Sequence, residues 1–81
     1  MSNNFEHFVL KYLYMIKFPS RLKELRLYKN MSRKTLANLL MIQERTISYW
    51  ELGQRECNLE QLANLAKIFN VTTDYLLGLE D

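Results

Sequence analysis

The 81-residue chain contains only two glycines and one proline, and this scarcity of turn-forming residues constrains its fold more than any other feature. A β-sandwich or β-barrel needs a turn about every 8–12 residues, and such turns depend heavily on glycine and proline. Apolar residues make up 48% of the chain, and after Pro19 they recur mainly at spacings of three and four, the period of an amphipathic helix. We therefore predict a single all-α domain.

Residues that favour helix ends divide the chain after Pro19 into five helical segments. Serine, threonine and asparagine side chains accept hydrogen bonds from the free N–H groups of a first helical turn, and glycine tolerates the left-handed backbone that ends many helices. Asn58 and Gln61 have the spacing of a capping box. The expected N-caps are Ser20, Ser32, Asn58 and Thr72, and the glycines expected just past a helix end are Gly53 and Gly78.

The segment 1–18 fits two kinds of structure. Read as a helix, it places six apolar residues on one face (Phe5, Phe8, Val9, Tyr12, Leu13 and Ile16). Read as a strand, alternate residues from Phe8 to Phe18 share one face, and the aromatic content favours this reading. We favour the helix because of the segment's length. Either form exposes too much apolar surface for a free tail. We predict an N-terminal extension, 1–18, that packs on the domain 19–81 or forms a dimer contact.

The net charge of +2 is the sum of two opposed regions. The stretch 17–55 holds nine basic residues and three acidic ones, a net charge of +6, whereas 56–81 has a net charge of −4. A basic centre indicates an anionic partner, although a solvated surface with uneven charge would give the same count.

Several classes of protein and site are disfavoured by the composition. One cysteine and one histidine do not make a disulfide framework or a metal centre, so we expect no metal and no cofactor. No apolar run approaches the ~18 residues of a membrane span, and no basic start indicates a signal peptide. We expect a cytoplasmic protein. No phosphate loop or nucleophile–base motif is present, so we do not expect an enzyme.

The most informative stretch, 33–52, predicts two short helices joined by a tight connection. Ala37 is a small residue in the middle of the first helix and allows the second helix to cross closely. Ile47 and Trp50, three residues apart, form an inner face on the second helix. The outer face is then polar, as suits a helix that enters a DNA major groove.

At this point the chain resembles the Cro/cI-type helix-turn-helix domains of the Xre family. The similar stretch is 21–78, from "RLKELR" through "TISYWELG" to "DYLLG". The resemblance implies a five-helix, lambda-repressor-like bundle with a positioning helix at 33–40 and a recognition helix at 43–52. The fold class expected for the whole chain is this bundle plus an N-terminal extension that is either a helix or an edge strand.

The resemblance also implies roles for individual residues. Arg33 stands where the family often has a glutamine that binds phosphate, and Arg26 and Glu51 match a pair that usually forms an internal salt bridge. Arg45 has the chemistry to bind guanine, and Gln43 to bind adenine. The expected base-facing residues are Gln43, Glu44, Arg45 and Tyr49, and the expected phosphate contacts are Arg33, Lys34, Ser48 and Arg55.

Three positions depart from the family pattern. Met41 stands in the turn where glycine is usual, Thr35 replaces a common acidic residue, and Cys57 replaces a common proline. A left-handed backbone is unfavourable for a residue with a side chain, so Met41 is expected to cost about 1 kcal/mol if the turn is unchanged. No departure removes a side chain expected at the groove.

The resulting hypothesis is a sequence-specific regulator of transcription that binds double-stranded DNA, expected as a repressor. A single recognition helix reads few base pairs, so we expect a homodimer on an inverted repeat. Two alternatives stay open: an antitoxin of the same fold that binds DNA and a toxin partner, and an adaptor that binds protein instead of DNA.

Overall fold

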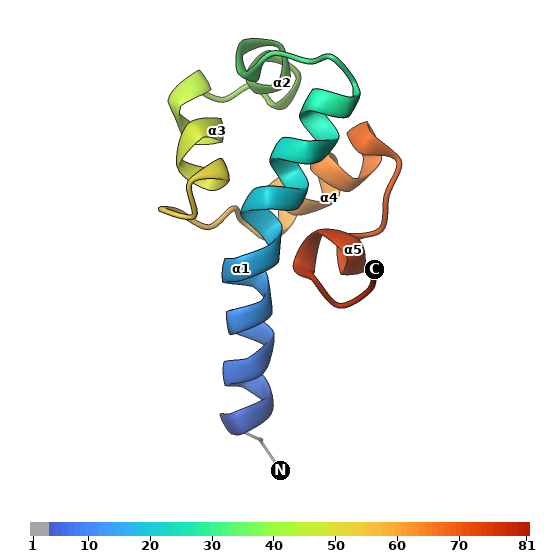
Figure 1. Cartoon of the computed structure of the whole chain (residues 1–81). Coiled ribbons are helices and arrows are strands. Elements are labelled where there is room, and N and C mark those ends of the chain that lie inside the picture. Colours follow the sequence, from blue (N-terminus) through green and yellow to red (C-terminus); the bar gives the residue numbers. More distant parts are fainter. Residues whose placement is uncertain (1–3) are drawn as a thin grey trace.

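The computed structural model describes residues 4–81, and in this part of the chain every regular element is a helix. There are five, as expected for the bundle, and Figure 1 shows their arrangement. The bounds are α1 Asn4–Tyr28, α2 Arg33–Leu40, α3 Glu44–Glu51, α4 Leu59–Phe69 and α5 Thr73–Leu77.

The first helix is longer than expected and corrects one prediction. We expected a new helix to begin after a Ser20 cap, but α1 continues through Pro19 without a break. The Ser20 hydroxyl donates to the Lys17 carbonyl at 3.2 Å instead of capping a first turn. Phe18 and Leu22, four residues apart, are both buried, so one helical face must continue across the proline to fill the core. The strand reading of the extension is wrong over residues 4–18, and residues 1–3 lie outside the described part.

The other predicted capping residues are confirmed. Ser32 accepts a hydrogen bond from the Thr35 N–H, and Thr72 accepts one from the Tyr75 N–H. Asn58 and Gln61 form the full capping box, with each side chain bound to the other residue's backbone. The two glycines, Gly53 and Gly78, both have positive φ angles. These local hydrogen bonds fix where α2, α4 and α5 start.

The core lies between the C-terminal half of α1 and the four short helices around it. Its largest fully buried side chains come from all five helices. They are Phe18, Leu22, Leu36, Ile47, Trp50, Leu65 and Leu76. Ala37, the small residue expected in the middle of α2, is also buried, and α2 contacts α3.

The molecule is elongated because the N-terminal half of α1 projects from the bundle. Its principal extents are 42, 22 and 19 Å. In Figure 1 the projecting half runs downward in blue, while α2 and α3 lie at the opposite end. Tyr14 and Phe18 stack on each other at 4.8 Å, close to where the projection meets the bundle.

Candidate nucleic-acid interface

A tight turn joins α2 to α3 and sets the angle between them. Met41 adopts a left-handed conformation, with φ 59° and ψ 42°, and its side chain is 91% exposed. The Ile42 N–H then donates to the Ala37 carbonyl at 3.0 Å, which satisfies the end of α2. Methionine therefore occupies the turn without a change of geometry, as the sequence analysis allowed.

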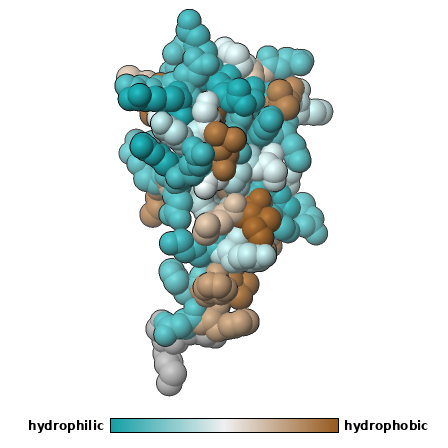
Figure 2. Space-filling view, turned by 60° about the vertical axis from the view of Figure 1, so that its left-hand side comes forward, coloured by the Kyte–Doolittle hydropathy of each residue, from teal (hydrophilic) through white to brown (hydrophobic). Residues whose placement is uncertain are grey.

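The second helix of the pair, α3, has a buried face and an open face. Ile47 and Trp50 are at most 1% exposed and anchor α3 in the core. The opposite face lies on the side of the molecule shown in Figure 2, where the surface over the bundle is mostly hydrophilic. The helix is one residue shorter at each end than expected, since Gln43 is its N-cap and Leu52 its C-cap.

Two of the expected base-facing residues contact each other. The Arg45 Nε donates to the Gln43 side-chain oxygen at 2.9 Å, and both side chains are exposed. The contact is possible because Gln43 precedes the helix in an extended conformation, with ψ 145°. It presents a guanidinium and a carboxamide side by side at the N-terminus of α3.

A second pair forms where the chain leaves α3. Gly53 has a φ of 72°, and the Gln54 N–H donates back to the Tyr49 carbonyl at 2.8 Å. This reversal brings the Arg55 guanidinium over the Tyr49 ring at 4.5 Å, a cation–π contact. Tyr49, expected to face bases, and Arg55, expected to bind phosphate, therefore act as one group. The sequence signal for this pair is Gly53, whose positive φ turns the chain back.

A network of three charged residues holds α1, α2 and α3 together. The Glu51 carboxylate, 2% exposed, accepts two hydrogen bonds from Arg26 on α1, of 2.7 and 3.1 Å. It also accepts one from the Arg33 Nε on α2, at 3.1 Å. Sequence reasoning missed the third member, because it assigned Arg33 to phosphate alone. The Arg33 side chain is still 39% exposed at the surface.

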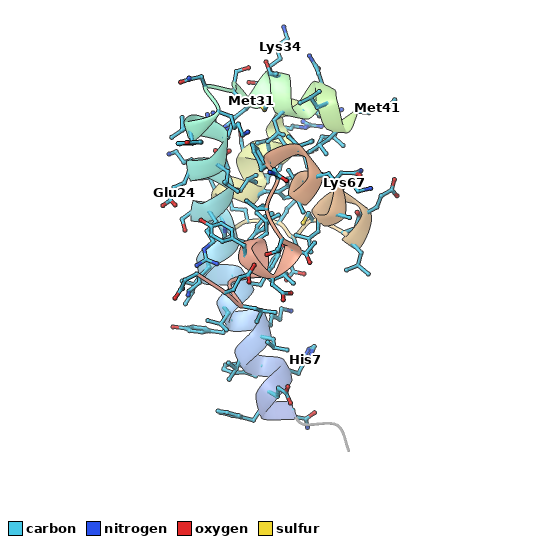
Figure 3. All side chains as sticks on the ribbon, turned by 90° about the vertical axis from the view of Figure 1, so that its right-hand side faces the viewer. His7, Glu24, Met31, Lys34, Met41 and Lys67 are labelled. Atoms are coloured by element: carbon cyan, nitrogen blue, oxygen red, sulfur yellow. The ribbon has the colours of Figure 1, made fainter. Side chains whose placement is uncertain are left out.

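The remaining expected site residues lie on the same two helices. Lys34 is exposed, and in Figure 3 it points away from the bundle at the end opposite His7, near Met41. Glu44 is exposed in the first turn of α3, where a carboxylate is favoured by the helix dipole. Ser48 is half-buried. The helix pair thus carries three basic side chains, Arg33, Lys34 and Arg45, and Arg55 adds a fourth from the loop after α3.

Part of the basic charge counted from the sequence is used elsewhere. The Arg21 guanidinium donates to the carbonyls of Tyr75 and Glu80 and lies over the Tyr75 ring. Both Arg21 and Lys17 form ion pairs with Asp81. The net charge of +6 therefore overstates what the helix pair offers an anion, because these two residues bind the acidic C-terminal segment.

The one cysteine lies away from the helix pair, beside the projecting part of α1. Its backbone N–H donates to the Tyr14 hydroxyl at 3.0 Å, and that hydroxyl lies 3.5 Å from the Cys57 Sγ. Burial raises the pKa of the Cys57 thiol above its usual value and, together with the contact to Cys57, raises the pKa of Tyr14 as well. Both groups are therefore uncharged near neutral pH.

Residues 4–81 contain no candidate metal centre and no candidate membrane span. No three metal-binding side chains among histidine, cysteine, aspartate and glutamate gather at one place there. None of the helices within the same range has the length and apolar character needed to cross a bilayer.

Comparison with known proteins gives a consistent result. A family model described as helix-turn-helix matches residues 22–76. The chain is 48% identical over 60 residues to the HTH-type transcriptional regulator AnsR of Bacillus subtilis, which covers 74% of this chain and 52% of that protein. It is 38% identical over 66 residues to the HTH-type transcriptional activator BcrR of Enterococcus faecalis, a match that covers 82% of this chain and 32% of that protein.

A third relative is the HTH-type transcriptional regulator ImmR of Bacillus subtilis, 36% identical over 61 residues, covering 75% of this chain and 48% of that protein. The chain therefore spans between a third and about half of the length of these relatives. No solved structure matches the chain significantly.

Proposed function

The chain belongs to the Cro/cI-type helix-turn-helix family, and we propose that it binds specific double-stranded DNA sequences with the open face of α3 as a regulator of transcription. The observation that carries this proposal is the Gln43–Arg45 pair at the exposed N-terminus of α3. Guanidinium and carboxamide groups are the side chains that most often form bidentate contacts with guanine and adenine in the major groove.

The residues around this pair divide into two roles. Gln43, Glu44, Arg45 and Tyr49 face the bases, with Glu44 able to accept from cytosine N4. Lys34, Ser48, Arg55 and Arg33 face the phosphates. An arginine has five N–H donors, so the bond from the Arg33 Nε to Glu51 leaves the terminal amino groups able to donate to a phosphate. Lys34 is exposed at the end of the molecule and, unlike Arg33, forms no ion pair with another described residue. Its charge is therefore available to a phosphate.

We further propose that two copies bind one inverted repeat and that binding represses the promoter it covers. The open face of α3 reads only a few base pairs, and two half-sites one helical turn apart (~34 Å) give the affinity that one lacks. Occupancy of a promoter is enough to block it, whereas activation needs a further contact with polymerase. Such a protein would act in the cytoplasm, on the nucleoid.

Selection from random duplexes followed by titration tests these proposals. We expect an enriched sequence with two-fold symmetry, and a log affinity that falls linearly with log salt concentration. A promoter reporter carrying the selected sequence should lose output when the protein is expressed. Binding with no preference among duplexes would contradict sequence-specific recognition, and an increase in reporter output would contradict repression.

A further inference from the structure

The projecting half of α1 carries a row of exposed apolar side chains that no other part of the described chain covers. Phe5, Phe8, Tyr12 and Met15 are 75%, 67%, 57% and 54% exposed. We call these four residues the α1 seam. Figure 2 shows brown and tan surface along this narrow part of the molecule, below the mostly hydrophilic bundle.

The seam has the spacing of a coiled coil. Its four members follow one another at intervals of three, four and three residues, which is the a/d pattern of a heptad. Tyr14, by contrast, lies about 200° around the helix from Tyr12 and contacts Cys57 on the bundle. The seam therefore occupies the outer face of α1. An apolar row with this spacing is the kind of surface that packs against another helix.

We infer that this partner is a second copy of the same chain, joined seam to seam in a symmetric dimer. A second copy presents an identical apolar row with the same spacing, so the contact is self-complementary, as two-fold interfaces require. Lys11, beside the seam, is paired with Glu56 of its own chain at 3.8 Å. Two such faces therefore meet without bringing unpaired ammonium groups together.

The area available is at the lower limit for a specific contact between two copies. A buried aromatic side chain covers about 150–250 Å², so the exposed parts of the three seam aromatics amount to roughly 300–500 Å² on each copy. Met15 and the neighbouring Ile16, 51% exposed, add to this area. Pairing two copies would remove at most on the order of 1,000 Å² from water, which is at the lower limit expected of a specific protein interface.

This interface deepens the proposed function, since it rests on the proposal that two copies bind one operator. It also locates the contact: the seam lies on the projection, and the projection points away from the end where Lys34 and Met41 lie (Figure 3). The dimer contact and the DNA-facing residues therefore occupy different parts of the molecule, and one can be altered without the other.

Sedimentation analysis of the full chain without DNA tests the inference. We expect a dimer at micromolar concentration, and we expect Phe8→Glu to weaken dimerisation by roughly 30-fold or more, as for a central interface residue. Phe8 is exposed, so a monomeric F8E should stay folded and keep its helix content. Leu59→Glu is the matched control, because it places the same charge at an exposed apolar residue on α4. This variant should stay dimeric.

Three results would overturn the interface: a monomeric parent chain, an F8E variant that dimerises as well as the parent, or an L59E variant that is monomeric. Tyr12→Glu provides a second test if F8E does not fold, and should also give a monomer. Titration with a single half-site separates this inference from the proposed function. A monomeric parent that binds the half-site would contradict the seam alone, and a dimeric parent that binds no duplex would contradict DNA recognition alone.

Discussion

The guanidinium of Arg26 and the carboxylate of Glu51 join α1 to α3 through two hydrogen bonds of 2.7 and 3.1 Å, in a setting where both side chains are almost fully buried. The same guanidinium donates to the Met31 carbonyl, where the chain leaves α1, at 2.9 Å. No buried side-chain nitrogen or oxygen in the described residues lacks a partner. The pair is therefore positioned to orient α3 against the long helix.

Glu51→Ala should unfold the domain at a much lower temperature. The substitution leaves Arg26 buried without its counter-ion, and removing one partner of a buried pair typically costs about 3–5 kcal/mol. For a domain of this size the melting temperature should fall by more than roughly 10 °C, as measured by circular dichroism. Glu44→Ala, at an exposed position on the same helix, should cost less than about 1 kcal/mol. Equal effects from the two variants would show that the pair does not stabilise the fold.

Met41→Gly should stabilise the domain. The methionine holds a left-handed backbone at φ 59° while its side chain is almost fully exposed, so glycine removes strain and little packing. We expect a gain of about 1 kcal/mol in the free energy of unfolding, measured with urea. Asn70→Gly is the matched control, since Asn70 has a φ of 54° but asparagine tolerates that conformation better. A loss of stability in M41G would mean that the methionine side chain contributes packing.

Local rules were sufficient to predict much of the fold. The caps formed by Ser32, Asn58 and Thr72 depend on residues no more than three apart, so a short stretch of sequence contains the whole interaction. The inward placement of Ile47 and Trp50 follows in the same way from helical spacing. The continuation of α1 through Pro19 could not be predicted from the local sequence. It depends on the burial of Phe18 and Leu22 in a core built by distant segments, which outweighs the cost of a proline inside a helix.

The candidate site was harder to predict, because contacts between side chains decide it. The sequence marks Arg33 as basic and near a helix start, but only the position of Glu51, eighteen residues later, shows that its Nε is engaged. Likewise, Arg55 over Tyr49 requires the chain reversal at Gly53. Counting charges along 17–55 also missed the use of Arg21 within the bundle. In each case the side chain contacts a residue that lies outside its own helix or loop, so the short stretch of sequence around it does not reveal the contact.

The stability of the domain should decline in alkaline solution. The folded state raises the pKa of Cys57, so above the thiol's usual pKa of about 8.5 the unfolded chain releases a proton that the folded chain retains. The contribution of the thiol to the free energy of unfolding should therefore be constant below about pH 8 and should be lost above about pH 9, by at most about 1.4 kcal/mol per pH unit. Urea denaturation at several pH values measures this change in the free energy of unfolding. Cys57→Ala should make the decline shallower, and an unchanged slope would rule out the thiol as its source.

Arg45→Ala and Lys34→Ala should affect DNA binding in different ways. Losing the guanidinium removes the proposed bidentate base contact, so Arg45→Ala should reduce discrimination at one base pair by about 1–3 kcal/mol. Lys34→Ala should weaken binding to all duplexes alike and lower the slope of log affinity against log salt by about 1. Lys34 is a cleaner probe than Arg33, whose removal would also disturb Glu51. Lys67→Ala, which removes an exposed charge from α4, controls for net charge. A change in base preference caused by Lys34→Ala would mean that the two roles have been assigned wrongly.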